Sequence, residues 1–161
     1  MEEGVQTMNK ALCPLLAGLG FLWAAGPVMA HCEIPCGIYN DGMRLQKIRE
    51  DIQTVEKSVG EIQNLSKEPK PNYNQIVRWV QNKEVHADDI REIVTQYFLA
   101  QRIKPESPNY GEQLTLAHGM IQQAMKAKQS SDLEAVAKLK DLVDRFEQAC
   151  LGPEGKAHLK E

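Results

Sequence analysis

A single apolar stripe runs through residues 45–62 and restricts this chain to helical folds. Its members are three or four positions apart, with charged side chains between them: Leu45, Ile48, Ile52, Val55, Val59 and Ile62. That spacing keeps one face of an α-helix apolar over about five turns, whereas a half-buried strand would alternate with a period of two. The stripe therefore predicts one long amphipathic helix that buries this face against other helices.

Three further segments repeat this pattern. The second predicted helix begins with Asn72 as its cap and Gln75 three residues later, and it carries Ile76, Val80, Ile90, Ile93, Val94, Tyr97 and Phe98. The third predicted helix carries Leu114, Ala117, Met120, Ile121, Ala124 and Met125. The fourth is predicted to begin with a capping box of Ser131 and Glu134, and it carries Leu133, Val136, Leu139, Val143 and Phe146.

Prolines mark the first two connections between the predicted helices and the end of the last helix. Pro69 and Pro71 lie in the first connection, Pro105 and Pro108 lie in the second, and Gly152-Pro153 follows the last helix. Four amphipathic helices with short connections predict an all-α fold, an antiparallel four-helix bundle over residues 40–161. The net charge is −3 and there is no long basic run, so we expect no nucleic-acid partner.

The first 30 residues have the pattern of a cleaved leader. Lys10 supplies a positive charge, an apolar stretch follows from Leu12 to Ala25, and Val28-Met29-Ala30 resembles a small-residue cleavage site. The acidic residues 1–7 are unlike the start of a signal peptide, which favours translation from Met8 or a harmless extension. A signal peptide predicts a periplasmic or secreted protein with no membrane association after removal by a leader peptidase. If the leader is only a propeptide, the protein is cytoplasmic.

Cleavage after Ala30 would create an unusual set of metal donors in residues 31–39, which we call the hook. His31 would offer both its new α-amine and its imidazole, and Cys32 and Cys36 would offer thiolates. The backbone nitrogen of Cys32 could join them after deprotonation. Mixed nitrogen and sulfur donors in a plane suit Ni(II) or Cu(II), whereas structural zinc prefers a closed tetrahedron of side chains.

Two residues of the hook are suited to folding it back on itself. Pro35 restricts its own φ and biases the residue before it towards an extended conformation, which helps to return Cys36 towards Cys32. Gly37 can leave the hook through a conformation closed to other residues. The remaining cysteines are different: Cys13 leaves with the leader, and Cys150 is predicted to be a small core or interface residue.

The hook resembles the N-terminal segment of the nickel superoxide dismutase family, whose signature is His-Cys-x-x-Pro-Cys-Gly-x-Tyr. All six fixed positions of that signature are present between His31 and Tyr39. The resemblance continues in residues 74–80, 83–87 and 97–102, and it covers residues 31 to about 150. It implies an enzyme that disproportionates superoxide to dioxygen and hydrogen peroxide through a Ni(II)/Ni(III) cycle.

The resemblance also implies roles for single residues. His31 would give its amine and, in the oxidised state, its imidazole to one nickel ion per chain. Cys32 would give its amide nitrogen and thiolate, and Cys36 its thiolate. Tyr39 would lie near the open face of the metal and hold water or the small anion. The resemblance further implies a homohexamer of four-helix bundles.

Two further residues are candidates for supporting the imidazole of His31. His86 lies where some relatives place an arginine with that role, and it could act through a hydrogen bond or be a partly solvated histidine. Relatives also use a glutamate early in the first helix, for which Glu50 is the candidate, with Asp51 or neither residue as alternatives.

Other interpretations of the hook remain open at the level of sequence. Two cysteines four positions apart in an exported protein can form a small disulfide loop on a structural bundle. An exported helical protein could also hold nickel or copper without turnover, or bind copper or zinc through a generic N-terminal site. The full signature and the preceding leader favour the enzyme.

Overall fold

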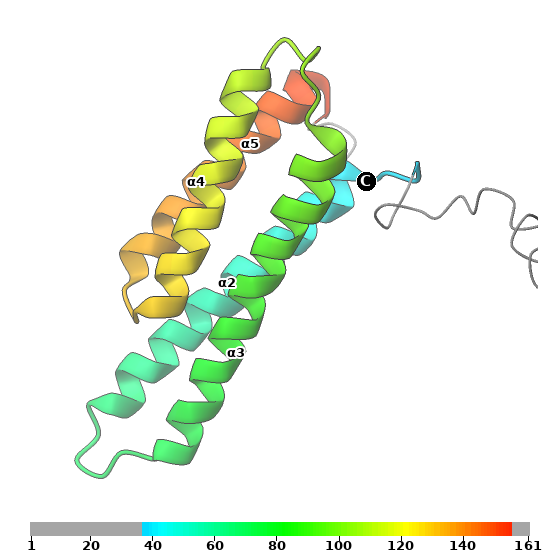
Figure 1. The fold of residues 1–161 in the computed structure, drawn as a ribbon. Helices are drawn as coiled ribbons and strands as arrows, with labels where there is room; N and C mark the ends of the chain where they lie inside the picture. The colour runs from blue at the N-terminus through cyan, green and yellow to red at the C-terminus, as the bar shows by residue number, and fades with distance from the viewer. Residues whose placement is uncertain (1–36, 156–161) are drawn as a thin grey trace, which may run out of the picture. The chain divides into compact units, whose positions relative to one another are not determined.

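The computed structural model describes residues 37–155, with side chains placed through residue 152. Within that range the regular structure is helical: α2 (Asp41–Ser66), α3 (Tyr73–Glu92), the π-helix η1 (Ile93–Arg102), α4 (Tyr110–Gln129) and α5 (Leu133–Gly155). Because η1 continues α3, the described chain has four helical rods, and Figure 1 shows each rod running opposite to the one before it. The prediction of an all-α helical bundle is confirmed for these residues.

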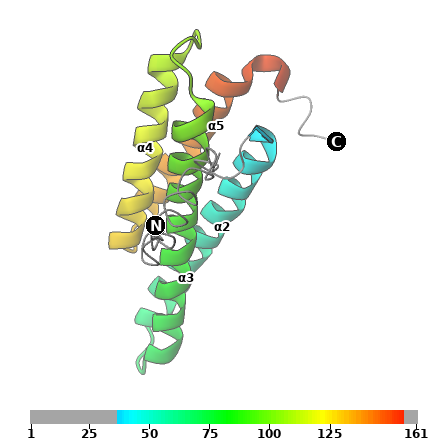
Figure 2. The ribbon, with the colours of Figure 1, turned by 45° about the vertical axis from the view of Figure 1, so that its right-hand side comes forward.

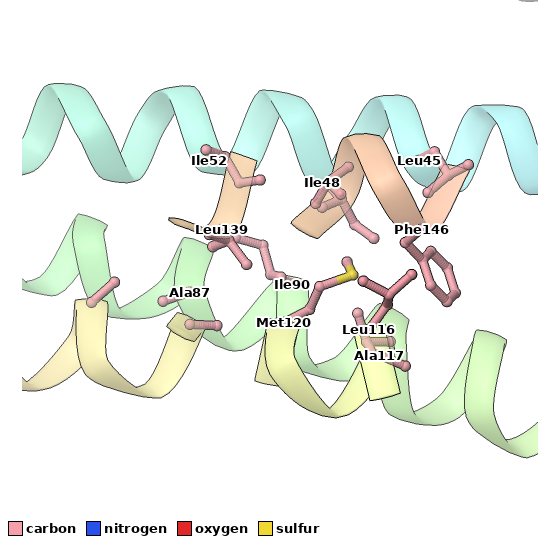
Figure 3. Packing of buried hydrophobic residues seen from close by; sticks show 14 of the residues in the cluster. Leu45, Ile48, Ile52, Ala87, Ile90, Leu116, Ala117, Met120, Leu139 and Phe146 are labelled. Atoms are coloured by element: carbon pink, nitrogen blue, oxygen red, sulfur yellow. The ribbon is translucent and has the colours of Figure 1, made fainter. Parts of the chain in front are cut away.

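The four rods surround one apolar core. α2 contacts α3 and α5, and α4 contacts the same two helices, so each rod has two neighbours. Every member of the first apolar stripe is buried, and Figure 3 shows side chains from all four rods meeting along the bundle axis. Burial of each large apolar side chain contributes about 1.5–3 kcal/mol. The tendency of these segments to bury one face therefore determines the architecture.

Two predicted core positions lie at the surface instead. Met125 is 42% exposed and Leu133 is 41% exposed, whereas Leu116, which the pattern did not select, is buried in α4. Met125 follows the buried Ala124 and lies at the margin of the apolar face of α4, whereas Leu133 is the first residue of α5. Tertiary packing decides which of these positions is buried.

One of the two predicted helix caps forms, and the other does not. Asn72 does cap α3, because its Oδ1 accepts a hydrogen bond from the backbone nitrogen of Gln75 at 3.2 Å. The predicted capping box of Ser131 and Glu134 is wrong. The cap of α5 is Asp132, whose Oδ1 accepts from the backbone nitrogen of Glu134 at 2.9 Å. A carboxylate one position later outcompetes the serine hydroxyl for the same free N–H groups.

The end of α5 bends where the sequence predicts a stop. Gly152 has φ +65°, a left-handed conformation that interrupts the helix before its last turn, and Figure 2 shows the resulting change of direction. Glycine adopts this conformation without the penalty that a Cβ imposes. None of the described helices combines the length and the apolar character needed to cross a membrane.

The π-helix η1 was not predicted from the sequence. Its wider turn closes with a hydrogen bond from the backbone nitrogen of Ile103 to the carbonyl oxygen of Phe98, at 2.9 Å. A π-helix has more residues per turn than an α-helix and is frequent at functional sites. Here it places Tyr97 and Phe98 in the core and brings Arg102 to the start of α2.

Candidate metal centre at the start of α2

The predicted metal donors His31, Cys32 and Cys36 lie outside the described residues, and their arrangement stays a prediction. The structure does describe the segment on which they are carried, from Gly37 onward. Gly37 has φ +78°, so the chain leaves the hook through the conformation that the sequence analysis assigned to glycine. Asn40 then caps α2, with its Oδ1 accepting from the backbone nitrogen of Met43 at 2.9 Å.

An ion pair fixes the first residue of α2. Arg102 donates from Nε and Nη2 to the two carboxylate oxygens of Asp41, at 2.7 and 2.8 Å. The hydroxyl of Tyr97 donates to the same carboxylate at 2.7 Å. A bidentate arginine restricts orientation as well as distance. We call Asp41, Tyr97 and Arg102 the root clamp, because they attach the base of the hook to η1.

Tyr39 lies directly on the root clamp. The guanidinium carbon of Arg102 is 4.5 Å from the centroid of the Tyr39 ring, a cation–π contact. The ring also meets Tyr97 edge-on, with centroids 5.9 Å apart and planes at 75°. Tyr39 remains 40% exposed, and no residue in the described part of the chain hydrogen-bonds to its hydroxyl. Its ring is thus held by Arg102 and Tyr97, while its hydroxyl has no partner among the described residues.

The aromatic contacts continue from Tyr39 into the core. Tyr97 meets Phe98, and Phe98 meets Phe146 on α5, each pair edge-to-face with centroids 5.0 Å apart. Both phenylalanines are fully buried. Such pairs contribute about 0.5–1.5 kcal/mol beyond the area they bury. The orientation of Tyr39 is therefore linked to the buried core of the bundle.

The root clamp also determines protonation states. Burial alone would raise the pKa of Asp41, but hydrogen bonds from Arg102 and Tyr97 and the charge of Arg102 outweigh it, and the pKa is lowered. Burial, followed by the hydrogen bond to Asp41, raises the pKa of Tyr97 to about 12. Near neutral pH the clamp therefore contains an ionised carboxylate, a guanidinium and a neutral phenol.

We expect Asp41→Asn to destabilise the protein by about 1–3 kcal/mol at pH 7, because the charged hydrogen bonds of Asp41 are lost. The pKa of Asp41 is lower in the folded state, so its contribution is present above the unfolded-state value near 3.8. It is lost as the pH falls through the folded-state pKa. Urea unfolding should show a smaller difference in the free energy of unfolding between the wild-type protein and Asp41→Asn at pH 3 than at pH 7.

The control for this prediction is Asp141→Asn. Asp141 is exposed and 3.6 Å from Arg145 on the same helix, so its removal should change stability by less than about 0.5 kcal/mol. An Asp41→Asn deficit that persists unchanged at pH 3 would contradict the assigned ionisation.

The two candidates for supporting His31 lie further along α2 and α3. His86 has its Nδ1 2.7 Å from Oδ1 of the fully buried Asp51. Glu50 is exposed, and its Oε1 accepts a hydrogen bond from Gln46 at 3.3 Å. The structure thus pairs His86 with Asp51, the alternative to Glu50. Ten residues of helix separate Asp51 from Asp41, about 15 Å. A contact of either candidate with His31 stays a prediction.

Sequence reasoning missed the root clamp. Tyr97 was selected only as a core residue, Arg102 only as part of a matching segment, and Asp41 not at all. The one local signal was an acidic residue in the first turn of a helix, which is common.

Cys150 is a packing residue, as predicted. It is a half-buried free thiol, and burial raises its pKa to about 12, so it is protonated near neutral pH.

Comparison with known proteins identifies the family. The sequence model of the family described as nickel-containing superoxide dismutase matches residues 26–151, which include the hook and the root clamp. No curated protein and no solved structure matches the chain. The family match covers well over half of the sequence, and the helical fold of the described residues agrees with it. The chain therefore belongs to the nickel-containing superoxide dismutase family and is an oxidoreductase that acts on superoxide.

Proposed function

We propose that this superoxide dismutase binds one nickel ion per chain through the hook, after cleavage behind Ala30. The ligands are the α-amine and imidazole of His31, the amide nitrogen and thiolate of Cys32, and the thiolate of Cys36. The observation that carries the proposal is the complete hook signature inside the span matched by the nickel-dependent family. The structure supports it by holding the base of the hook at Gly37–Asp41.

The donor set fits nickel and its redox chemistry. Thiolates and an anionic amide nitrogen are strong electron donors, and imidazole also suits nickel. Nickel in such a set supplies one-electron chemistry between Ni(II) and Ni(III). Two superoxide anions and two protons then give one dioxygen and one hydrogen peroxide: one superoxide is oxidised, and the other is reduced and protonated.

The residues of this chain have to hold a small anion near the hook and keep water in place for proton delivery. Tyr39 is suited to both tasks because Arg102 covers one face of its ring while its hydroxyl is free of described partners. Tyr97 is not equivalent: its hydroxyl already donates to Asp41. We therefore assign the contact with superoxide or its ordered water to Tyr39.

Tyr39→Phe is expected to retain nickel but to change substrate saturation and inhibition by small anions such as azide, because only the hydroxyl is lost. Steady-state and azide-inhibition kinetics at matched nickel content measure this. The matched control is Tyr110→Phe, which removes a hydroxyl elsewhere in the bundle. Kinetics of Tyr39→Phe that equal those of the control would remove Tyr39 from the site.

The remaining parts of the proposal concern assembly and location. The homohexamer is supported by apolar side chains exposed beside the hook, since Ile38 is 80% exposed and Met43 is 54% exposed. Export to the periplasm or the medium is supported by the leader of residues 1–30, and a leader peptidase would then expose His31.

The experiment that tests the proposal measures intact mass, metal content and superoxide decay for protein purified from its native host. We expect a mass beginning at His31, about one nickel per chain and rapid superoxide decay. A Cys32–Cys36 disulfide without metal would overturn the proposal in favour of a structural bundle. Nickel or copper at full occupancy without turnover would instead identify a metal carrier.

A further inference from the structure

A second group of possible metal ligands lies between α2 and α3. Asp51, His86 and Asp89 each offer one ligand atom, and these atoms all lie within 4.8 Å of one another. Asp51 is on α2, and the other two residues are three positions apart on α3. We call these three residues the α2–α3 cluster.

One carboxylate oxygen of Asp51 lacks a hydrogen-bond partner among the described residues. Its side chain is fully buried, and its Oδ1 faces Nδ1 of His86 and accepts a hydrogen bond from Lys47. Its Oδ2 is also buried and has no hydrogen-bond partner among the described residues. Burying a carboxylate oxygen without a partner costs folding free energy. Such an atom is therefore a candidate for binding an ordered water or an ion.

The cluster already attracts a cation. The ammonium group of Lys47 contacts Oδ1 of Asp51 and lies 3.9 Å from Oδ2 of Asp89. The two carboxylates thus face a single ammonium group. Lys47 is 44% exposed at its side chain, so its flexible stem can carry the ammonium into solvent. A divalent ion in its place would balance both carboxylates.

The ligand geometry is close to what zinc requires. Zinc binds imidazole nitrogen and carboxylate oxygen at about 2.0–2.2 Å, so in its tetrahedral coordination the ligand atoms lie about 3.3–3.6 Å apart. Nδ1 of His86 is 2.7 Å from Asp51 Oδ1 and 4.0 Å from Asp89 Oδ2. Zinc binding would therefore move Nδ1 of His86 away from Oδ1 of Asp51 and draw Oδ2 of Asp89 closer, which the part-exposed side chains of His86 and Asp89 permit.

We propose that the α2–α3 cluster is a second metal site that binds zinc through Asp51, His86 and Asp89, with Lys47 as its competing internal cation. Imidazole and carboxylate without thiolate suit zinc and lack the sulfur donors on which the redox chemistry of the hook depends. The site would therefore be redox-silent, and its effect would be to fasten α2 to α3. The proposal does not depend on nickel ligation by the hook.

The test uses the full processed protein with nickel already bound. Equilibrium dialysis against buffered Zn²⁺, followed by elemental analysis, should show one zinc per chain with the nickel retained. His86→Ala and Asp89→Asn, which replace part-exposed side chains, should each weaken zinc binding by more than about tenfold. Lys47→Met should instead tighten it, because the competing ammonium is gone.

His118→Ala is the matched control, since His118 is an exposed histidine on α4. It should leave zinc binding unchanged, and zinc should raise the melting temperature of the wild-type protein but not of His86→Ala. Zinc binding that His86→Ala leaves intact would overturn the proposal. So would zinc that only replaces nickel one for one, or the absence of zinc from the dialysed protein.

Discussion

A chain that keeps Ala30 in front of His31 is expected to bind no nickel and to show no superoxide dismutation above background. The single extra residue converts the α-amine of His31 into an amide, whose neutral nitrogen is a poor metal donor. The imidazole then loses its chelate partner on the same residue. Elemental analysis and direct observation of superoxide decay, both on protein dialysed against Ni²⁺, measure the two losses.

The control is the same chain cut to begin at His31, expressed and loaded in the same way. Its circular dichroism and unfolding curve should match those of the extended chain, because the root clamp begins at Asp41 and does not involve the amine. Full nickel content and activity in the extended chain would contradict the assignment of the α-amine as a ligand.

His31→Gln is expected to keep its nickel and to lose turnover by at least about a hundredfold. The amine of residue 31, the Cys32 amide and both thiolates remain in this variant, so four donors still hold the ion. The imidazole donor that serves the oxidised state is gone. Nickel content and the rate of superoxide decay, both measured per chain, separate binding from turnover.

His118→Gln provides the comparison, because it makes the same substitution at an exposed position on α4. It should leave both quantities unchanged. Complete loss of nickel from His31→Gln would show that the imidazole is needed to hold the ion, and would remove it from the proposed redox role.

Much of the bundle could be predicted because helix formation follows from local spacing. The stripe from Leu45 to Ile62 is buried throughout, and the Asn72 cap forms as expected. The errors arose where two local solutions compete, as at the start of α5, where Asp132 caps the helix and Ser131 does not. The π-helix η1 was not predicted, because the spacing of its apolar residues also fits a continued α-helix.

The candidate site was likewise predicted only in part. The hook could be recognised because its donors are adjacent in sequence and their chemistry is specific. The root clamp could not, because Asp41 meets Tyr97 and Arg102 across 56 and 61 positions. Likewise, the sequence left Glu50, Asp51 or neither as the support of the His31 imidazole, and it did not predict that the packing of α2 against α3 pairs Asp51 with His86.

The length of chain between Asp41 and Arg102 has a consequence for the order of events during synthesis. At about 5–20 residues per second, the ribosome needs roughly 3–12 s to add the 61 positions that separate them. Throughout that interval the cysteines near the N-terminus have been made, but the arginine that anchors their base has not. Metal captured during translation would therefore be held by a segment that is not yet anchored to the bundle.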